Sequence, residues 1–257
     1  MAELLIEPDP IFADRRDAGR ALAAALAEGE LGSELVVVGL ARGGVETAAE
    51  VARLLDAPLD VVAVRKIGHP WQPEYGIGAV TPGDGIYVRA SDGLTAEQLA
   101  TIVEDTKAKA ALLDRKLHGD HPPLPLGGKT VLVVDDGLAT GATMIAALRW
   151  ARARGASRVV AAVPVAPAES LRLIHREADE VVCPHALEHF FAVGAHFASF
   201  RQVDDEAVAR LLDENRRARD LRARLAGATT KQVCVTGAAS RDELKAIVAE
   251  YHHLLEV

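Results

Sequence analysis

Short apolar runs alternate along the chain with stretches of helical periodicity. The runs cover residues 35–40, 59–64, 130–135, 158–165 and 180–183. Residues 35–40 are continuously apolar and the other runs are mostly apolar, which is typical of strands buried on both faces. The helical patterns cover residues 14–28, 45–55, 95–118, 141–154 and 167–177. This βαβ spacing predicts an α/β fold, with a doubly wound, mostly parallel sheet and helices on both of its faces.

Two internal segments depart from this alternation. Residues 64–80 are rich in Gly and Pro and predict a loop with one short hairpin. Residues 184–200 hold four of the five Phe residues and show neither a strand nor a helix pattern. Both segments lie where a surface feature can be added to the sheet.

The C-terminal part has a different character. A charged, Arg-rich helix is predicted over residues 204–225, with a hinge at the sequence GATTKQ after it. A short strand (VCV) and a helix over residues 241–257 follow. We therefore expect a main domain over residues 1–203 and a C-terminal helical extension over residues 204–257.

Composition excludes several classes of protein. The 257 residues carry a net charge of −8, so the chain lacks the basic field that holds nucleic acid. No stretch approaches the roughly 20 apolar residues that cross a bilayer, and the first ten residues lack a signal pattern. The two cysteines, Cys183 and Cys234, lie far apart. We therefore expect a reduced, cytoplasmic protein that binds neither a membrane nor nucleic acid.

Two adjacent aspartates stand at the end of the third apolar run. The sequence VLVVDDGLATGAT, residues 131–143, places Asp135 and Asp136 before a turn of small and hydroxyl residues and a helix. Ligands of doubly wound sheets gather at the carboxyl ends of strands. Paired carboxylates suit vicinal sugar hydroxyls or a hydrated magnesium ion, and a turn of small residues before a helix suits a phosphate. The segment predicts a site for a phosphorylated sugar.

This strand, acidic pair and turn resemble the phosphoribosyl-pyrophosphate signature of type I phosphoribosyltransferases. The wider likeness, to an uncharacterised bacterial group of that family, covers roughly residues 11–212. The resemblance implies that Asp135 and Asp136 hold the ribose hydroxyls and Mg²⁺. It also implies a turn that binds the 5-phosphate, made of Ala139, Thr140, Gly141, Ala142 and Thr143. The alternative is an ordinary strand-to-helix turn whose aspartates act as caps.

Ala139 departs from the pattern of the purine-salvage members. That position is commonly an Asp in those members, where it serves the purine N7. Because alanine cannot transfer a proton, a hypoxanthine- or guanine-type reaction is not expected. Any acid or base must come from elsewhere in the chain.

A second candidate segment, GLARGGVETA, follows the first strand. Arg42 offers forked donors, and Gly43 and Gly44 allow close approach of an anion to the backbone. The segment resembles the diphosphate-binding loop of the family. The alternative is a simple tight turn.

The third segment, residues 64–80, resembles the mobile loop that closes over the active site in the family. Arg65 and Lys66 are candidates for contact with the departing diphosphate, or for a subunit interface. Glu74 and His69 are candidates for proton transfer. The alternative is a proline-rich surface turn anchored by a tryptophan.

The Phe-rich residues 184–200 occupy the position of the family's variable hood over the acceptor. Phe191 and its neighbours Phe190 and Phe197 are candidates for stacking on a flat ring, or for packing in the core. One cysteine and three histidines in this region match no common zinc spacing: Cys183, His185, His189 and His196.

The motifs together predict a magnesium-dependent phosphoribosyltransferase. It would use phosphoribosyl pyrophosphate and a small-molecule acceptor, and family resemblance implies a homodimer. One alternative is a module that senses phosphoribosyl pyrophosphate or a nucleotide without chemistry. Another is a hydrolase of a phosphorylated sugar on the same kind of sheet.

Overall fold

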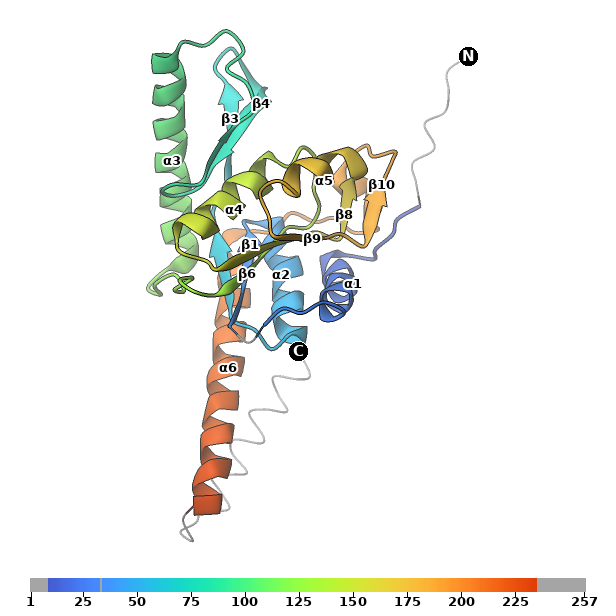
Figure 1. Cartoon of the computed structure of the whole chain (residues 1–257), viewed down its shortest axis with the longest axis vertical. Coiled ribbons are helices and arrows are strands. Elements are labelled where there is room, and N and C mark those ends of the chain that lie inside the picture. Colours follow the sequence, from blue (N-terminus) through green and yellow to red (C-terminus); the bar gives the residue numbers. More distant parts are fainter. Residues whose placement is uncertain (1–8, 33, 235–257) are drawn as a thin grey trace.

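A five-stranded parallel sheet forms the centre of the molecule (Figure 1), in a computed structural model that describes residues 9–32 and 34–234. Its strands are β1 (Leu35–Leu40), β2 (Leu59–Val62), β6 (Thr130–Val134), β7 (Arg158–Ala162) and β9 (Glu180–Val182). They lie in the order β2-β1-β6-β7-β9, and every neighbouring pair is parallel. The predicted doubly wound sheet is confirmed.

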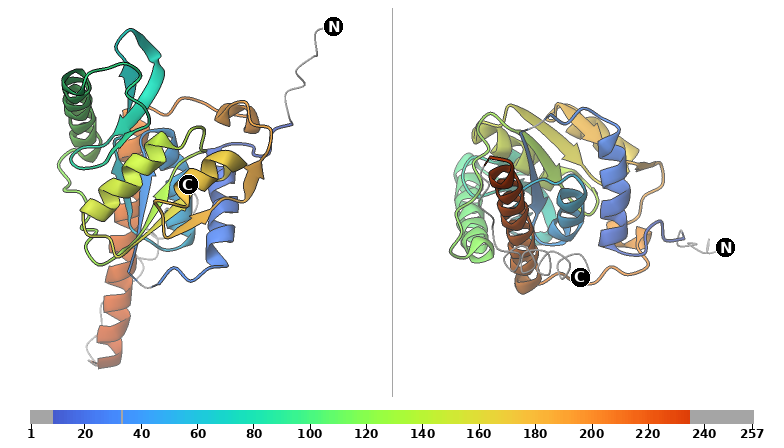
Figure 2. Two further views of the ribbon diagram at one scale, coloured as in Figure 1. Left: turned by 45° about the horizontal axis from the view of Figure 1, so that its top comes forward. Right: turned by 90° about the horizontal axis from the view of Figure 1, so that it is seen from below.

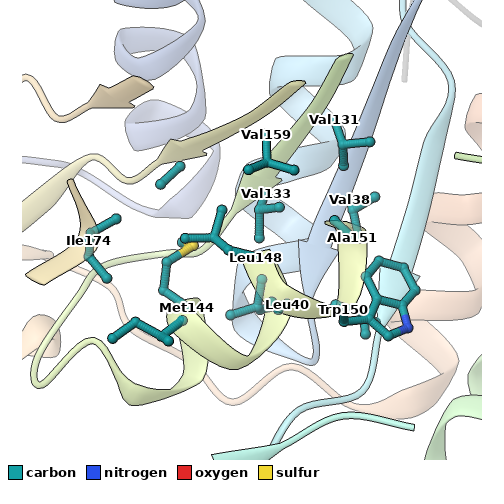
Figure 3. Close-up of a cluster of buried hydrophobic side chains, with 14 of the residues drawn as sticks. Val38, Leu40, Val131, Val133, Met144, Leu148, Trp150, Ala151, Val159 and Ile174 are labelled. Carbon is teal, nitrogen blue, oxygen red and sulfur yellow. The ribbon is translucent and has the colours of Figure 1, made fainter. Parts of the chain in front are cut away.

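Helices cover both faces of this sheet (Figures 1 and 2). The helices α1 (Arg15–Ala27), α2 (Gly43–Leu54) and the first part of α6 (Asp205–Cys234) pack on one face. The helices α4 (Ala142–Ala153) and α5 (Ala168–Ile174) pack on the other. Figure 3 shows this second core, in which strand valines meet Met144 and Leu148 of α4. Burial on both faces explains why the strands are mostly apolar.

A small antiparallel sheet stands beside the central one. It consists of β3 (Arg65–His69), β4 (Gln72–Val80) and β5 (Ile86–Val88), in that order, and α3 (Ala96–His118) packs on it. Thr95 caps α3 in a reciprocal capping box with Gln98, as its position predicts. The segment 64–80, predicted as a loop with one short hairpin, does contain a hairpin, β3–β4, but it is strand over most of its length, and β5 lies outside the predicted strands.

A buried ionic network joins α3 to the central sheet. His118 lies between Asp60 of β2 and Asp114. Its Nε2 atom lies 2.9 Å from Oδ1 of Asp60, and its Nδ1 atom lies 2.8 Å from the backbone carbonyl oxygen of Asp114. Asp60 also accepts the N–H of Leu124, and Asp114 accepts that of Ala63. Burial lowers the pKa of His118, but the hydrogen bonds to Asp114 and Asp60 raise it more, to about 10. His118 is therefore a cation at neutral pH.

The strand predicted over residues 158–165 is divided. β7 ends at Ala162, and β8 (Val165–Pro167) pairs instead with β10 (His185–Leu187) in a separate two-stranded sheet. Pro164 between them has no N–H to donate to a neighbouring strand. A short 3₁₀ helix, η1 (Val193–His196), completes the Phe-rich region.

The last described helix extends well beyond the body of the molecule (Figure 1). The hinge predicted at residues 227–232 is wrong, because α6 continues to Cys234. The strand predicted over residues 233–235 is also wrong, because residues 233 and 234 belong to α6. Residue 235 and the helix predicted over residues 241–257 lie outside the described residues. The boundary at residue 204 stays a prediction. Within the described residues, no helix combines the length and apolarity needed to cross a membrane.

Candidate functional site

The carboxyl ends of β1 and β6 lie side by side where the strand order changes direction. Such a switch point is the usual ligand position in a doubly wound sheet. A cavity of about 650 Å³ opens here. Its lining residues come from several elements: Arg15, Ala41, Arg42, Gly43, Val64, Arg65, Lys66, Leu113, Asp136, Phe200, Arg201, Gln202 and Val203.

Asp136 is the carboxylate that faces this cavity. Arg15 donates its Nε–H to Oδ2 of Asp136 at 2.7 Å, and the two side chains are only 7% and 14% exposed. Arg15 also donates to the carbonyl oxygen of Arg201 at 2.6 Å and lies 3.8 Å from the ring centroid of Phe200. Burial raises the pKa of Asp136, whereas the Arg15 guanidinium opposes that rise. The ion pair thus orients Asp136 and favours its charged form.

Asp135 lies next to Asp136 but does not line the cavity. Its Oδ1 accepts the N–H of Asp136 at 2.9 Å. Burial, and then the charge of Asp136, raise the pKa of Asp135 well above its usual range. The pair therefore favours a ligand that brings hydroxyl groups or a cation to it.

Gly43 and Gly44 pack directly on the aspartate pair at the start of α2. A Cβ atom on Gly43 would overlap Oδ2 of Asp136 and lie 3.0 Å from Nε of Arg15. A Cβ atom on Gly44 would lie 2.7 Å from Oδ1 of Asp135 and 2.9 Å from the Val134 carbonyl oxygen. The segments after β1 and β6 therefore fit together only because both positions lack a side chain.

Arg42 is held from outside the central sheet. Its Nε–H donates to Oδ1 of Asp205 at 2.5 Å, and the other oxygen of Asp205 accepts from Lys116 at 2.7 Å. The peptide bond between Ala41 and Arg42 is cis. Arg42 thus reaches the cavity with one of its donor groups already engaged.

The turn after the aspartates leads into α4. Gly141 has a left-handed backbone with φ of 81° at the helix N-cap, and neither a capping side chain nor an acidic residue occupies the first turn. Ser170 donates to the Ala139 carbonyl oxygen at 2.6 Å, which anchors the turn to α5. Ala139 and Thr140 are exposed, and Ala142 and Thr143 are half-buried. The N–H groups at this helix start are therefore available to an anion.

The cavity brings together only part of the predicted site. Arg42, Gly43, Arg65, Lys66 and Asp136 line it. Gly44, Asp135 and the turn 139–143 adjoin these residues without lining the cavity. Glu74 is an exposed residue of β4, Phe191 is 85% exposed, and neither lines the cavity. Their predicted roles stay predictions.

The other aromatic residues of the Phe-rich region pack against protein. Phe197 is 5% exposed and its ring centroid lies 5.4 Å from that of Phe12. Phe190 packs on His196, with ring centroids 5.0 Å apart. Within the part of the chain that the structure describes, no group of three His, Cys, Asp or Glu side chains is placed to hold a metal ion.

Arg15 and residues 201–203 are not among the predicted site residues, and Phe200 is predicted only as part of the Phe-rich segment 184–200. One signal for Arg15 was available, because it falls on the apolar stripe of α1 together with Ala18, Leu22 and Leu26. A charged side chain on such a stripe indicates a buried partner. No pattern in residues 201–203 indicates their place in the cavity.

The acidic pair has the chemistry to hold a magnesium ion. Mg²⁺ takes oxygen ligands, needs only one or two carboxylates and keeps water or phosphate oxygens at its other positions. Asp136 offers such an oxygen to the cavity, and Asp135 stands next to it. A metal bound by protein ligands alone would need more donors than these two residues supply.

The chain is similar to known proteins over most of its length. The sequence profile of the phosphoribosyl transferase domain matches residues 13–197. Proteins from two strains of Mycobacterium tuberculosis, each named "Putative phosphoribosyl transferase", are 42% identical over 212 residues. The match covers 80% of this chain but 47% of each relative, so the chain spans about half the length of those proteins.

One solved structure is similar over nearly its whole length. It is the protein TT1426 from Thermus thermophilus, with 41% sequence identity and a TM-score of 0.68. The similarity covers 78% of this chain and 97% of that one. The fold is therefore shared with this known protein.

Proposed function

Because the chain belongs to the phosphoribosyl transferase domain family, we propose that it transfers the 5-phosphoribosyl group of phosphoribosyl pyrophosphate to an acceptor and releases diphosphate. The observation that carries the proposal is the cavity at the sheet's switch point. It combines one oriented carboxylate, Asp136, with cations from separate elements, among them Arg42, Arg65 and Lys66. A ligand with sugar hydroxyls at one end and a diphosphate at the other matches this distribution of charge.

Each part of the donor has a counterpart in the site. The Asp135–Asp136 pair receives the ribose hydroxyls, and the turn 139–143 receives the 5-phosphate at the start of α4. Arg42 and the backbone of Gly43 and Gly44 bind the diphosphate, with Arg65 and Lys66 adding positive charge. When bound, Mg²⁺ would neutralise part of the diphosphate charge, and Asp136 would help to hold it.

The reaction moves one group between two partners. The bond from C1 to the diphosphate oxygen breaks, its electron pair leaves with the diphosphate, and a lone pair of the acceptor forms the new bond to C1. Positive charge develops at C1 as the first bond stretches. Arg42 and Lys66 stabilise the leaving diphosphate, and Asp136 lies on the side of the ribose, where positive charge grows.

One observation favours the sensor as a second candidate. Among the described residues, the only carboxyl group that lines the cavity belongs to Asp136, which is ion-paired, and Glu74 and His69 lie outside the lining. A site that binds phosphoribosyl pyrophosphate without turnover needs no proton-transfer group. Release of diphosphate in the presence of a panel of acceptors distinguishes an enzyme from a sensor.

Calorimetric titration with phosphoribosyl pyrophosphate and Mg²⁺ tests both candidates. We expect binding by the natural sequence and loss of binding when Asp135→Asn and Asp136→Asn are combined. Asp120→Asn, an exposed carboxylate outside the cavity, is the matched control and should bind as the natural sequence does. Absence of binding by the natural sequence would refute the enzyme and the sensor alike.

We also propose that the protein acts in the cytoplasm as a homodimer, and that its ligands are small molecules and not nucleic acid. The cytoplasmic location and the lack of nucleic-acid binding rest on composition, and the homodimer and the small-molecule ligands rest on family resemblance. Sedimentation of the purified chain tests the dimer.

A further inference from the structure

One side of the cavity comes from beyond the family-matched region, which ends at residue 197. Phe200, Arg201, Gln202 and Val203 all line the cavity. Arg15, the partner of Asp136, rests on Phe200 and on the carbonyl oxygen of Arg201. The segment that leads into α6 is therefore part of the site.

The first residue of α6 reaches the same cavity indirectly. Asp205 accepts hydrogen bonds from Arg42 at 2.5 Å and from Lys116 at 2.7 Å, and its side chain is 13% exposed. Arg42 follows β1 and Lys116 belongs to α3, so one carboxylate joins three elements. The Arg42 guanidinium, and then Lys116, lower the pKa of Asp205, which is therefore charged at neutral pH.

The contact leaves Arg42 able to bind an anion. Asp205 accepts a hydrogen bond only from the Nε–H of Arg42. The two Nη groups of Arg42 make no hydrogen bond or ion pair within the described residues. The three side chains carry two positive charges and one negative charge, so the group stays cationic. A long side chain that is fixed at one donor loses less freedom when its other donors bind a ligand.

We propose that Asp205 is a positioning residue, which holds Arg42 toward the diphosphate of the bound donor and makes the first turn of α6 part of the active site. This inference rests on the proposed function, because it assumes that Arg42 meets a diphosphate. Asp205 itself touches no substrate.

The test compares two ligands that differ only in the diphosphate. Phosphoribosyl pyrophosphate and ribose 5-phosphate, each with Mg²⁺, are titrated into the full chain by calorimetry. In Asp205→Asn we expect affinity for phosphoribosyl pyrophosphate to fall about tenfold, which corresponds to about 1.4 kcal/mol. Affinity for ribose 5-phosphate should stay unchanged, because that ligand does not reach Arg42.

Two further variants separate positioning from a structural effect. Asp204→Asn alters the neighbouring carboxylate, which accepts the N–H of Ala207 at the helix start and does not contact Arg42. Because Asn caps helices as well as Asp does, this variant should bind both ligands as the natural sequence does. Asp205→Glu keeps the charge and should recover part of the lost affinity.

Each remaining result counts against one of the two proposals. Equal loss of both ligands in Asp205→Asn would show a structural role only, and unchanged or tighter binding of phosphoribosyl pyrophosphate would show that Asp205 competes with the diphosphate. Either result overturns the positioning role. Failure of the natural sequence to bind phosphoribosyl pyrophosphate would instead overturn the proposed function, and this inference with it.

Discussion

Two walls of the cavity are built in different ways. The inner wall, defined as Arg15, Gly43 and Asp136, is closely packed, and its two charged side chains are 7% and 14% exposed. The outer wall, defined as Arg65 and Lys66 at the start of β3, is exposed, and neither side chain forms an ion pair within the described residues. The inner wall can therefore select a ligand by its shape. The outer wall supplies positive charge, which is screened by solvent and salt.

The difference reflects where each wall lies in the fold. The inner wall lies between α1, α2 and the end of β6, where a displacement of one atom disturbs a packed neighbour. The outer wall belongs to the antiparallel sheet beside the central one, whose hairpin tip carries exposed residues such as Trp71. Substitutions in the two walls should consequently differ in size and in salt dependence.

Glycine substitutions give the largest expected effect on ligand binding. Gly43→Ala should displace Asp136 from Arg15 and weaken binding of phosphoribosyl pyrophosphate by at least about tenfold, as calorimetry would measure. Gly44→Ala should also lower the free energy of unfolding by about 1–3 kcal/mol, because its Cβ meets backbone atoms of Val134 and Asp135. Urea denaturation measures this loss.

The matched control for these glycines is Gly76→Ala in β4. Among the described residues, no atom lies within 4 Å of a Cβ at Gly76, so binding and stability should both stay close to those of the natural sequence. If Gly43→Ala bound phosphoribosyl pyrophosphate as tightly as Gly76→Ala does, the close packing of the inner wall would not determine ligand binding.

A buried ionic network anchors the outer wall. Asp114 and His118 fix α3 to β2, a few residues before Arg65. His118 has a pKa of about 10 in the folded chain, above its ordinary value of 6.5. Its contribution to stability should be complete below about pH 6.5 and should be lost as the pH rises toward 10.

Urea denaturation between pH 6 and pH 10 measures this slope. His118→Gln should remove the slope and, by leaving Asp60 without its cation, cost about 3–5 kcal/mol of unfolding free energy. The exposed His121 is the control, and His121→Gln should keep the slope of the natural sequence. A natural sequence whose stability did not change with pH in this range would contradict a protonated His118.

The same contrast explains how much of the molecule the sequence could predict. The sheet and the Asp135–Asp136 turn were predictable because continuous apolar runs and a strand-turn-helix motif are local signals. The strand pairing of residues 64–80 was only partly predicted, since Gly and Pro there suggested a loop while buried Ile67 and Ile77 form a small core with α3. Local composition does not report such tertiary packing.

The candidate site shows more clearly what a single sequence does not predict. Asp136 was predicted from its motif, but its partner Arg15 lies 121 residues away in sequence, and Asp205 lies 163 residues from Arg42. Contacts between positions so far apart leave no spacing pattern in one sequence. The helix stripe that includes Arg15 indicates burial, but it does not identify the partner.

The smallest expected effect belongs to the outer wall. Combining Arg65→Gln with Lys66→Gln should weaken binding of phosphoribosyl pyrophosphate only about twofold to fivefold, because exposed charges are screened and each contributes about 0.2–0.5 kcal/mol. Calorimetry at low salt and at about 0.5 M salt measures it, and the loss should nearly vanish at the higher concentration, where the Debye length is a few ångströms. Lys109→Gln, an exposed cation of α3 outside the cavity, is the control. A loss that persisted at high salt would mean that Arg65 or Lys66 contacts the ligand directly, and the distinction between the two walls would fail.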